Sequence, residues 1–247
     1  MSEKKLALIT NGKRLDGRKL NEIRPMKIEA GVLAHADGSC YIEMGKTKVI
    51  AGVFGPMEFH PKHKQDPLTG ILNCRYRMAA FSTEERIRPG PSRRSTEISM
   101  VTANALTPAL FLREYPKTMV ELTIEVLQAD ASTRVAGINA ASVALADAGI
   151  PMRDLVTSVA VGKVDGQLVL DVAGKEDTEG ETDFPVAMLP RSRKITLMQL
   201  DGHLTKDEFG KAMDLAWSGV DTIYKMQVKA LKDKYVKEKI ATEEVQK

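Results

Sequence analysis

Two segments of the chain alternate apolar and polar residues so regularly that each restricts the local fold to a β-strand with one buried face. In residues 71–78 the even positions carry apolar or aromatic side chains, and two of the odd positions carry arginine. In residues 120–126 the even positions are again apolar, and two of the odd positions carry glutamate. Successive side chains of a strand point to opposite faces of a sheet. We therefore expect two half-buried strands, the first with a basic outer face.

Weaker signals predict the remaining elements. We expect a hairpin from residues 39–44 and 47–54 around Gly45, a second hairpin around Asp165-Gly166, further strands and three helices. The expected ranges after the first hairpin are 158–164, 167–172, 184–188 and 194–200 for strands, and 92–112, 131–148 and 205–240 for helices. Pro108 should kink the first helix or end it early, and a Thr205/Glu208 capping box should begin the third.

The order of these elements favours an α+β fold. Strands and helices do not alternate strictly, as they would in a doubly wound sheet. Each half of the chain has a hairpin, a charged loop, a further strand and a helix. With 247 residues the chain can bury a self-sufficient core. We expect one domain over residues 1–247 that consists of two similar halves.

Composition excludes some classes of protein and leaves others open. The chain has 36 Lys+Arg and 33 Asp+Glu, a net charge of +3, so overall charge does not indicate nucleic-acid binding. Cys40 and Cys74 fall on the apolar phase of expected strands and should be reduced core thiols. No Cys/His cluster has zinc spacing. No signal peptide and no apolar run of about 20 residues is present, so we expect a cytoplasmic protein.

Positive charges at two expected helix starts suggest an anion site. Arg93 and Arg94 begin one helix, and Arg134 begins the next. A helix N-terminus carries partial positive charge, so arginine there is mildly unfavourable unless an anion lies among the cations. Backbone N–H groups, hydroxyls and guanidinium groups together bind phosphate well. Alternatively, each arginine pairs with a nearby acid such as Glu97 or Asp130.

Two charged loops are further candidates. Residues 175–183 contain five carboxylates, and Asp183 lies where the loop meets an expected strand. A carboxylate held there could act as a general acid or base, or help to bind a divalent cation. Residues 59–64 are basic and could contact a polyanion. Either loop could instead be an ordinary solvated surface loop.

Short motifs in consecutive order resemble the ribonuclease PH family. They are Arg14-Leu15-Asp16-Gly17-Arg18, Gly38-Ser39, Gly45-x-Thr47-x-Val49, Gly55-Pro56, Gln128-Ala129-Asp130-x-x-Thr133-Arg134 and Glu176-Asp177-x-x-x-Glu181-Thr182-Asp183. They fall within residues 13–190. Within the family, Asp183-Phe184-Pro185-Val186-Ala187 together with Arg93-Arg94 looks most like catalytic ring subunits of archaeal exosomes.

The resemblance implies a fold, an activity and partners. The fold would have two similar β/α halves, a type also described as ribosomal protein S5 domain 2-like. The activity would be 3′-to-5′ phosphorolysis of RNA with inorganic phosphate as co-substrate, and the reverse reaction could add 3′ tails. Six such folds would form a ring, a trimer of heterodimers with a related inactive subunit. RNA-binding cap subunits and single-stranded RNA 3′ ends would be the other partners.

The family pattern also assigns roles by position to the residues of the phosphate site. Ser132, Thr133 and Arg134 would hold inorganic phosphate, with Arg94 close by. Bacterial ribonuclease PH has Gly-Gly before Thr-Arg, where this chain has Ala131-Ser132. The loop should therefore be less flexible, although the Ser132 hydroxyl can still donate a hydrogen bond.

The remaining roles concern catalysis and RNA. Asp183 would be the catalytic carboxylate, and Asp177 would support it or, with Asp183, bind Mg²⁺. Arg93 and Arg94 would bind the last RNA phosphates, and Lys62 and His63 would lie at the RNA entrance of the ring.

Three alternatives stay open at this point. The chain could be a non-catalytic RNA-binding ring subunit, although such a sibling should lack counterparts of Asp183 and Arg134. It could be a bacterial-type homohexamer that trims transfer RNA. It could also be a ribosomal or assembly protein that reuses the fold, for which basic patches without an acidic pair would suffice.

Overall fold

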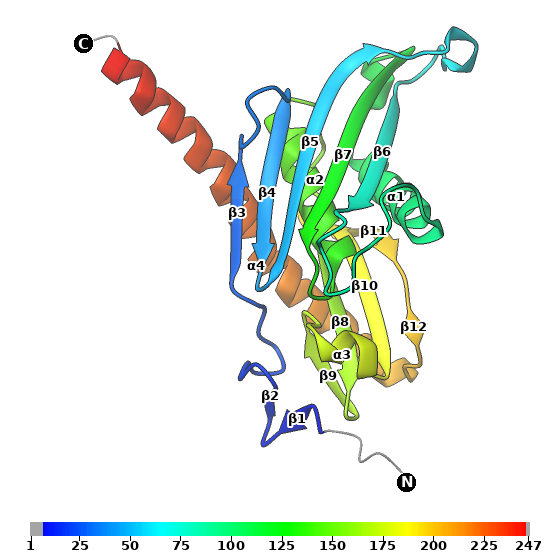
Figure 1. Ribbon diagram of the computed structural model, residues 1–247, viewed down its shortest axis with the longest axis vertical. Coiled ribbons are helices and arrows are strands. Elements are labelled where there is room, and N and C mark those ends of the chain that lie inside the picture. The colour runs from blue at the N-terminus through cyan, green and yellow to red at the C-terminus, as the bar shows by residue number, and fades with distance from the viewer. Residues whose placement is uncertain (1–6, 246–247) are drawn as a thin grey trace.

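A computed structural model describes the backbone of residues 7–245 and the side chains of residues 7–63 and 65–236. Two sheets form the body of the molecule (Figure 1). The first has the order β3-β4-β5-β7-β6, in which only β6 and β7 are parallel. Its strands are β3 (Met26–Ala30), β4 (Gly38–Met44), β5 (Thr47–Glu58), β6 (Ile71–Met78) and β7 (Thr118–Gln128). The alternation in residues 71–78 and 120–126 is therefore confirmed as two neighbouring strands.

The second sheet has the order β11-β10-β8-β9, and a short strand β12 also pairs with β10. Its strands are β8 (Thr157–Val164), β9 (Gln167–Leu170), β10 (Thr182–Leu189), β11 (Lys194–Met198) and β12 (Asp201–Gly202). Asp165 and Gly166 both have positive φ in the turn between β8 and β9, as the hairpin prediction requires. A separate small hairpin joins β1 (Ile9–Thr10) to β2 (Lys13–Arg14).

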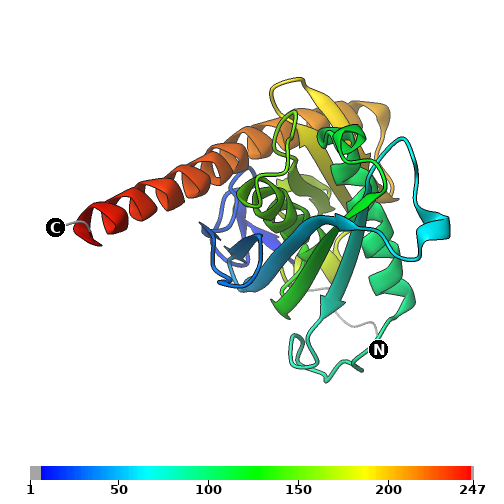
Figure 2. The same cartoon turned by 90° about the horizontal axis from the view of Figure 1, so that it is seen from above.

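Helix α2 (Thr133–Asp147) lies between the two sheets and is buried on nearly all sides (Figure 2). Small residues fill most of its length, which lets the strands approach it closely. The Asn139 side chain bonds both the N–H and the carbonyl of Ser158 at 2.8 Å, which joins α2 to β8. The buried core is continuous from β4 to β10 through this helix. Cys40 and Cys74 are free and buried in that core, as expected.

Two more helices flank the sheets. Helix α1 (Arg93–Leu106) packs against β6 and β11, and a 3₁₀ turn, η2 (Thr107–Ala109), follows it. Pro108 therefore ends the first helix early, as expected. Helix α4 (Lys206–Val245) packs on β8, β9 and β3 and begins with the Thr205/Glu208 capping box. Figure 1 shows its C-terminal part extending beyond both sheets.

The structure corrects the expected bounds of residues 131–148 and 175–183. Residues 175–183 are not a continuous loop, because Lys175–Glu179 form a short helix, α3, and Asp183 lies inside β10. Helix α2 begins at Thr133, since Ala131 and Ser132 are left-handed, with φ of 63° and 52°. The other 3₁₀ turns are η1 (Lys62–Lys64) and η3 (Leu112–Glu114). The α+β class is confirmed, with two sheets around one central helix.

Candidate functional site

A cleft of about 510 Å³ lies where α1, α2 and α3 meet the start of β10 and the segment before β12. Six of the residues singled out in the sequence line it: Arg94, Ser132, Thr133, Arg134, Asp177 and Asp183. They come from positions as far apart in the chain as 94 and 183, so the fold has assembled them. Gln199, Leu200 and Asp201 complete one wall and were not foreseen.

The other three predicted residues lie elsewhere. Arg93 precedes Arg94 on α1 and is exposed, but it does not line the cleft. Lys62 and His63 are exposed in η1, in the connection from the end of β5 to the start of β6. This connection lies far from α3 (Figure 1). If Lys62 and His63 contact an RNA whose end lies in the cleft, that RNA must be long, or neighbouring subunits must take part.

The start of α2 offers backbone donors to the cleft. No side chain caps this helix, and no acidic residue stands in its first turn. Its first N–H groups therefore lack intrahelical partners and carry the positive end of the helix dipole. Such a helix start is a suitable site for an anion.

The two hydroxyls beside this helix start already have partners. Ser132 Oγ donates to the Val172 carbonyl at 2.8 Å. A hydroxyl has one proton, so Ser132 cannot donate to an anion without giving up that bond. Thr133 Oγ1 accepts a bond from the Tyr76 hydroxyl at 2.9 Å and keeps its own proton. The backbone of the loop, rather than the Ser132 hydroxyl, is thus the ready donor in this arrangement.

Arg134 is held by two side chains, one from α1 and one from the segment between β11 and β12. Its Nη2 lies 3.0 Å from Glu97 Oε2, and its Nη1 donates to Gln199 Oε1. The alternative that a helix-start arginine pairs with Glu97 is therefore correct for Arg134. Its Nε is buried and has no hydrogen-bond partner within the described part of the chain. An anion in the cleft would supply the missing acceptor.

Arg94, unlike Arg134, is not held by an ion pair among the described residues. Among the described residues, neither Arg93 nor Arg94 forms an ion pair, and both are exposed. The positive charges of Arg94 and Arg134 act on Asp177 and Asp183 and partly offset the effect of burial on their pKa values. Arg94 is therefore available to a ligand without first breaking an ion pair.

Two of the three carboxyls that line the cleft, Asp177 and Asp183, have a raised pKa. Burial, followed by repulsion from Asp177, raises the pKa of Asp183 to about 6, and Asp201 adds a smaller repulsion. Burial also raises the pKa of Asp177, and the nearby arginines Arg94, Arg24 and Arg134 counteract it. A carboxyl with a pKa near 6 can donate or accept a proton at neutral pH. Asp183 is held in place by the strand, since it pairs with Gly162 of β8 and Asp201 of β12.

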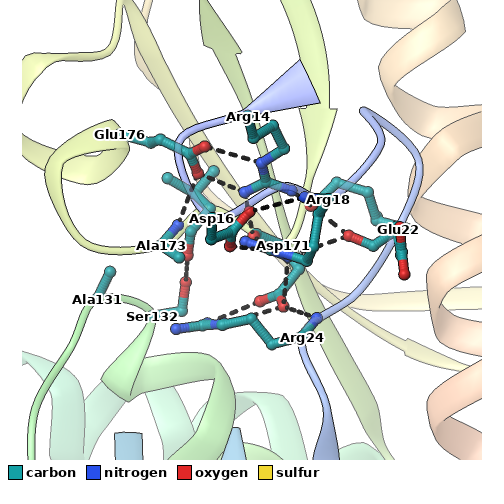
Figure 3. Close-up of polar contacts among 12 residues, drawn as sticks. Arg14, Asp16, Arg18, Glu22, Arg24, Ala131, Ser132, Asp171, Ala173 and Glu176 are labelled. Carbon is teal, nitrogen blue, oxygen red and sulfur yellow. Dashed lines mark hydrogen bonds and ion pairs between the residues drawn. The ribbon is translucent and has the colours of Figure 1, made fainter. Parts of the chain in front are cut away.

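A buried ion-pair cluster joins the N-terminal segment to residues 171–176 (Figure 3), and the motifs quoted above contain only part of it: Arg14, Arg18 and Glu176. Three arginines of the N-terminal segment, Arg14, Arg18 and Arg24, are each less than 10% exposed. Their carboxylate partners include Asp171 and Glu176, both buried. A buried arginine is tolerated only when it is paired. In the sequence, the signal of this cluster was the motif that contains Arg14 and Arg18.

Comparison with known families gives matches over most of the chain. A model of the 3′ exoribonuclease family, domain 1, matches residues 22–151. A model of domain 2 of the same family matches residues 154–219. The division between the two matches falls between α2 and β8.

Several curated archaeal proteins are similar over nearly their whole length. The exosome complex component Rrp41 of Thermococcus kodakarensis is 60% identical over 227 residues, which cover 92% of this chain and 91% of that protein. The protein of the same name from Methanopyrus kandleri is 56% identical over 236 residues, covering 95% and 99%.

Solved structures share the fold. Rice Rrp46 superposes with a TM-score of 0.79 at 22% identity, covering 88% of this chain and all of that one. A chain of the Archaeoglobus fulgidus exosome with RNA bound to the active site superposes with a TM-score of 0.75 at 24% identity, covering 86% and 92%. In the described residues, no helix combines the length and apolar character needed to cross a membrane.

Proposed function

The chain belongs to the 3′ exoribonuclease family, and we propose that it shortens single-stranded RNA from the 3′ end by phosphorolysis, as the catalytic subunit of an exosome ring. One observation carries the proposal. A single cleft joins an uncapped helix start and two arginines, which suit anions, to two carboxyls of raised pKa, which suit proton transfer.

The arrangement supports a balanced reaction. An oxygen of inorganic phosphate attacks the phosphorus of the last phosphodiester, and the bond from that phosphorus to the 3′ oxygen of the preceding nucleotide breaks. A nucleoside diphosphate leaves, and the new 3′ oxygen takes up a proton. Attacking phosphate and RNA phosphate repel each other, and Arg94, Arg134 and the α2 N–H groups offset that repulsion. Asp183 is the proton donor in this proposal.

Mg²⁺ belongs to the proposal as a candidate cofactor. Within the described residues there is no group of three or more His, Cys, Asp or Glu side chains placed to hold a metal. Mg²⁺ is often bound through only one or two carboxylates together with substrate phosphates. Asp177 and Asp183 fit that pattern, because a cation between them would relieve the repulsion that Asp177 exerts on Asp183. The ion would neutralise charge on the phosphates when bound.

RNA contacts would extend from the cleft outward. Arg93 and Arg94 are exposed at the start of α1 and free of ion pairs among the described residues, which suits contacts to the last phosphates of the strand. Lys62 and His63 would contact RNA further from its end, at an entrance shared between ring subunits. The name of the archaeal relatives, exosome complex component, supports membership of a complex with other subunits. In our proposal these are a related inactive ring subunit and RNA-binding caps.

The direct test is product analysis. Assembled protein, a short labelled RNA and magnesium should release nucleoside diphosphates only when phosphate is present. Excess nucleoside diphosphate should instead extend the RNA 3′ end. Release of nucleoside monophosphates at an equal rate without phosphate would show hydrolysis and would overturn phosphorolysis.

A further inference from the structure

We infer that Arg24 is a positioning residue for the proposed phosphate site, which it shapes by fastening the backbone before α2 to the segment that leads into α3. The inference rests on the proposed function. Arg24 does not line the cleft, and its side chain is 4% exposed. It acts through the Asp171 carboxylate, a contact drawn in Figure 3, and through the carbonyl of Asp130.

The guanidinium group of Arg24 connects two places at once. Its Nε and Nη2 donate to the two carboxylate oxygens of Asp171 at 2.9 and 2.7 Å. Its Nη1 donates in another direction, to the carbonyl of Asp130 at 2.7 Å. Asp130 directly precedes the left-handed pair Ala131 and Ser132, from which α2 starts. A planar fork with donors on different sides reaches acceptors that lie apart, whereas the donors of an ammonium group all lie on one atom.

Asp171 carries the restraint to the other segment. It is buried and has a φ of 59°, so its backbone conformation is unusual for a non-glycine residue. The next residue, Val172, accepts the hydrogen bond from Ser132 Oγ. The Asp130–Ser132 loop and the 171–174 segment are therefore joined directly through Ser132 and indirectly through Arg24.

The same cluster fixes α3. Arg14 pairs with Glu176, and its Nη2 also donates to the Asp171 carbonyl at 2.7 Å. Glu176 in turn accepts a bond from the N–H of Ala173 at 3.0 Å. Asp177, the second carboxylate of the cleft, directly follows Glu176. The anion-binding backbone and this carboxylate therefore share one buried support.

The local backbone needs such support. Ala131 and Ser132 are consecutive non-glycine residues with positive φ, a strained backbone that persists only where the surroundings hold it. Thr47 provides a second restraint, since its Oγ1 accepts from Asp130 N–H and donates to the Ala131 carbonyl, both at 3.0 Å. Without the bond from Arg24, the Asp130 carbonyl and the following N–H groups should turn away from the cleft. In the proposed function those N–H groups contact inorganic phosphate, whereas the exposed arginines of α1 contact the RNA.

A matched pair of substitutions tests the inference in the assembled complex. Arg24→Lys keeps the charge and removes the fork. Arg18→Lys is the control, because Arg18 is also buried in the segment and contacts Asp171 at 3.3 Å, but makes no bond to residues 130–132. Phosphate KM, RNA Kd, thermal stability and direct phosphate binding by calorimetry are measured for each. We expect Arg24→Lys to raise phosphate KM by about 10-fold or more, since small displacements of a binding group have large effects, with RNA Kd changed less than about twofold.

The outcomes separate the inference from the proposed function. If the wild-type complex neither binds phosphate nor needs it, the proposed function fails. If wild type is phosphorolytic but Arg24→Lys leaves phosphate KM unchanged, or Arg18→Lys raises it equally, Arg24 has only a structural role. If Arg24→Lys does not fold, Thr47→Val releases the same loop from its other side. An unchanged phosphate KM in that variant overturns the inference, and a rise supports it.

Discussion

At the scale of single residues, the position and raised pKa of Asp183 support the proposed chemistry most directly. Asp183→Asn keeps the size of the side chain and removes its proton affinity. We expect the phosphorolysis rate to fall by at least about 10²-fold, the usual contribution of a general acid or base, with RNA affinity nearly unchanged. Single-turnover rates and RNA binding measured on the same preparation check this. Full activity would remove Asp183 from the mechanism.

The same substitution should make the protein more stable at neutral pH. The folded pKa of Asp183 is raised from 3.8 to about 6, so the folded state binds the proton more tightly than the unfolded state. The wild-type protein therefore loses stability as the pH rises from about 4 to 6, and Asn removes that loss. We expect a gain of about 1–3 kcal/mol above pH 6, since a tenfold change in acid dissociation corresponds to about 1.4 kcal/mol.

Denaturation of wild type and Asp183→Asn at pH 4 and pH 7 measures this gain. The two should differ little at pH 4 and more at pH 7. A difference that is the same at both pH values would mean that Asp183 does not titrate in this range.

Asp177 should have a milder role, because it is more exposed than Asp183. We expect Asp177→Asn to reduce the rate less than Asp183→Asn, and higher Mg²⁺ to restore part of the activity if the two carboxylates share the ion. A titration of the rate with Mg²⁺ for each variant measures this. Equal reductions with no response to Mg²⁺ would contradict a shared site.

Sequence patterns found the residue types of the cleft but not how they are used. Arg94 and Arg134 were recognised because they stand at expected helix starts. Asp183 was recognised because it stands where a charged loop meets an expected strand. The Ser132 hydroxyl bond to Val172 and the part played by Gln199 in holding Arg134 depend on segments far apart in sequence. No local pattern can reveal such contacts.

At the scale of elements, the start of α1 is the feature that a salt titration can probe. Arg93 and Arg94 are exposed and unpaired among the described residues, so they are available to phosphates. Replacing both with Ala should weaken RNA binding and flatten its salt dependence. The slope of log affinity against log salt should fall by about 0.7 for each phosphate of a single strand that the variant no longer neutralises.

The control for this double variant is Arg75→Ala. Arg75 is also exposed, but it pairs with Glu121 at 3.1 Å on the outer face of β6. It should leave the salt slope unchanged. If the slope is equally unchanged for Arg93→Ala/Arg94→Ala, the α1 arginines are ordinary surface charges.

Elements with a repeating apolar pattern were predicted well, and elements held by tertiary contacts were not. Strands β6 and β7 and helix α4 follow directly from periodicity. Helix α3 was missed because its five residues are too few to show a period, and buried Glu176 holds it through Arg14. Strand β3 was missed as well, although it pairs with β4 over five residues.

At the scale of the whole molecule, the surface near the cleft indicates that the chain is one part of a larger assembly. Strand β11 is an edge of its sheet, and it exposes Ile195 and Met198 at 44% and 51%. Met100 of the neighbouring helix α1 is 58% exposed, and Leu200 beside the cleft is 47% exposed. An exposed sheet edge with apolar side chains promotes aggregation unless another chain covers it.

Assembly therefore decides between the exosome proposal and a bacterial-type homohexamer. In the proposed function a single copy would contact RNA phosphates from one side only, and Lys62 and His63 lie in η1, far from α3. We expect this chain alone to be weakly active and mixed in oligomeric state. Mixing it with a related ring subunit that lacks counterparts of Asp183 and Arg134 should give a six-membered ring, three copies of each, with large activation.

Mass by light scattering, taken beside the phosphorolysis rate before and after mixing, tests this expectation. Activation must track the formation of the ring, because a shared entrance exists only when neighbours are present. Lys62→Ala then gives an independent check. It should reduce the rate on long RNA in the ring and have little effect on the isolated chain, where η1 has no neighbour with which to form an entrance. A stable and fully active homohexamer of this chain alone would contradict the heteromeric ring and favour the bacterial-type enzyme.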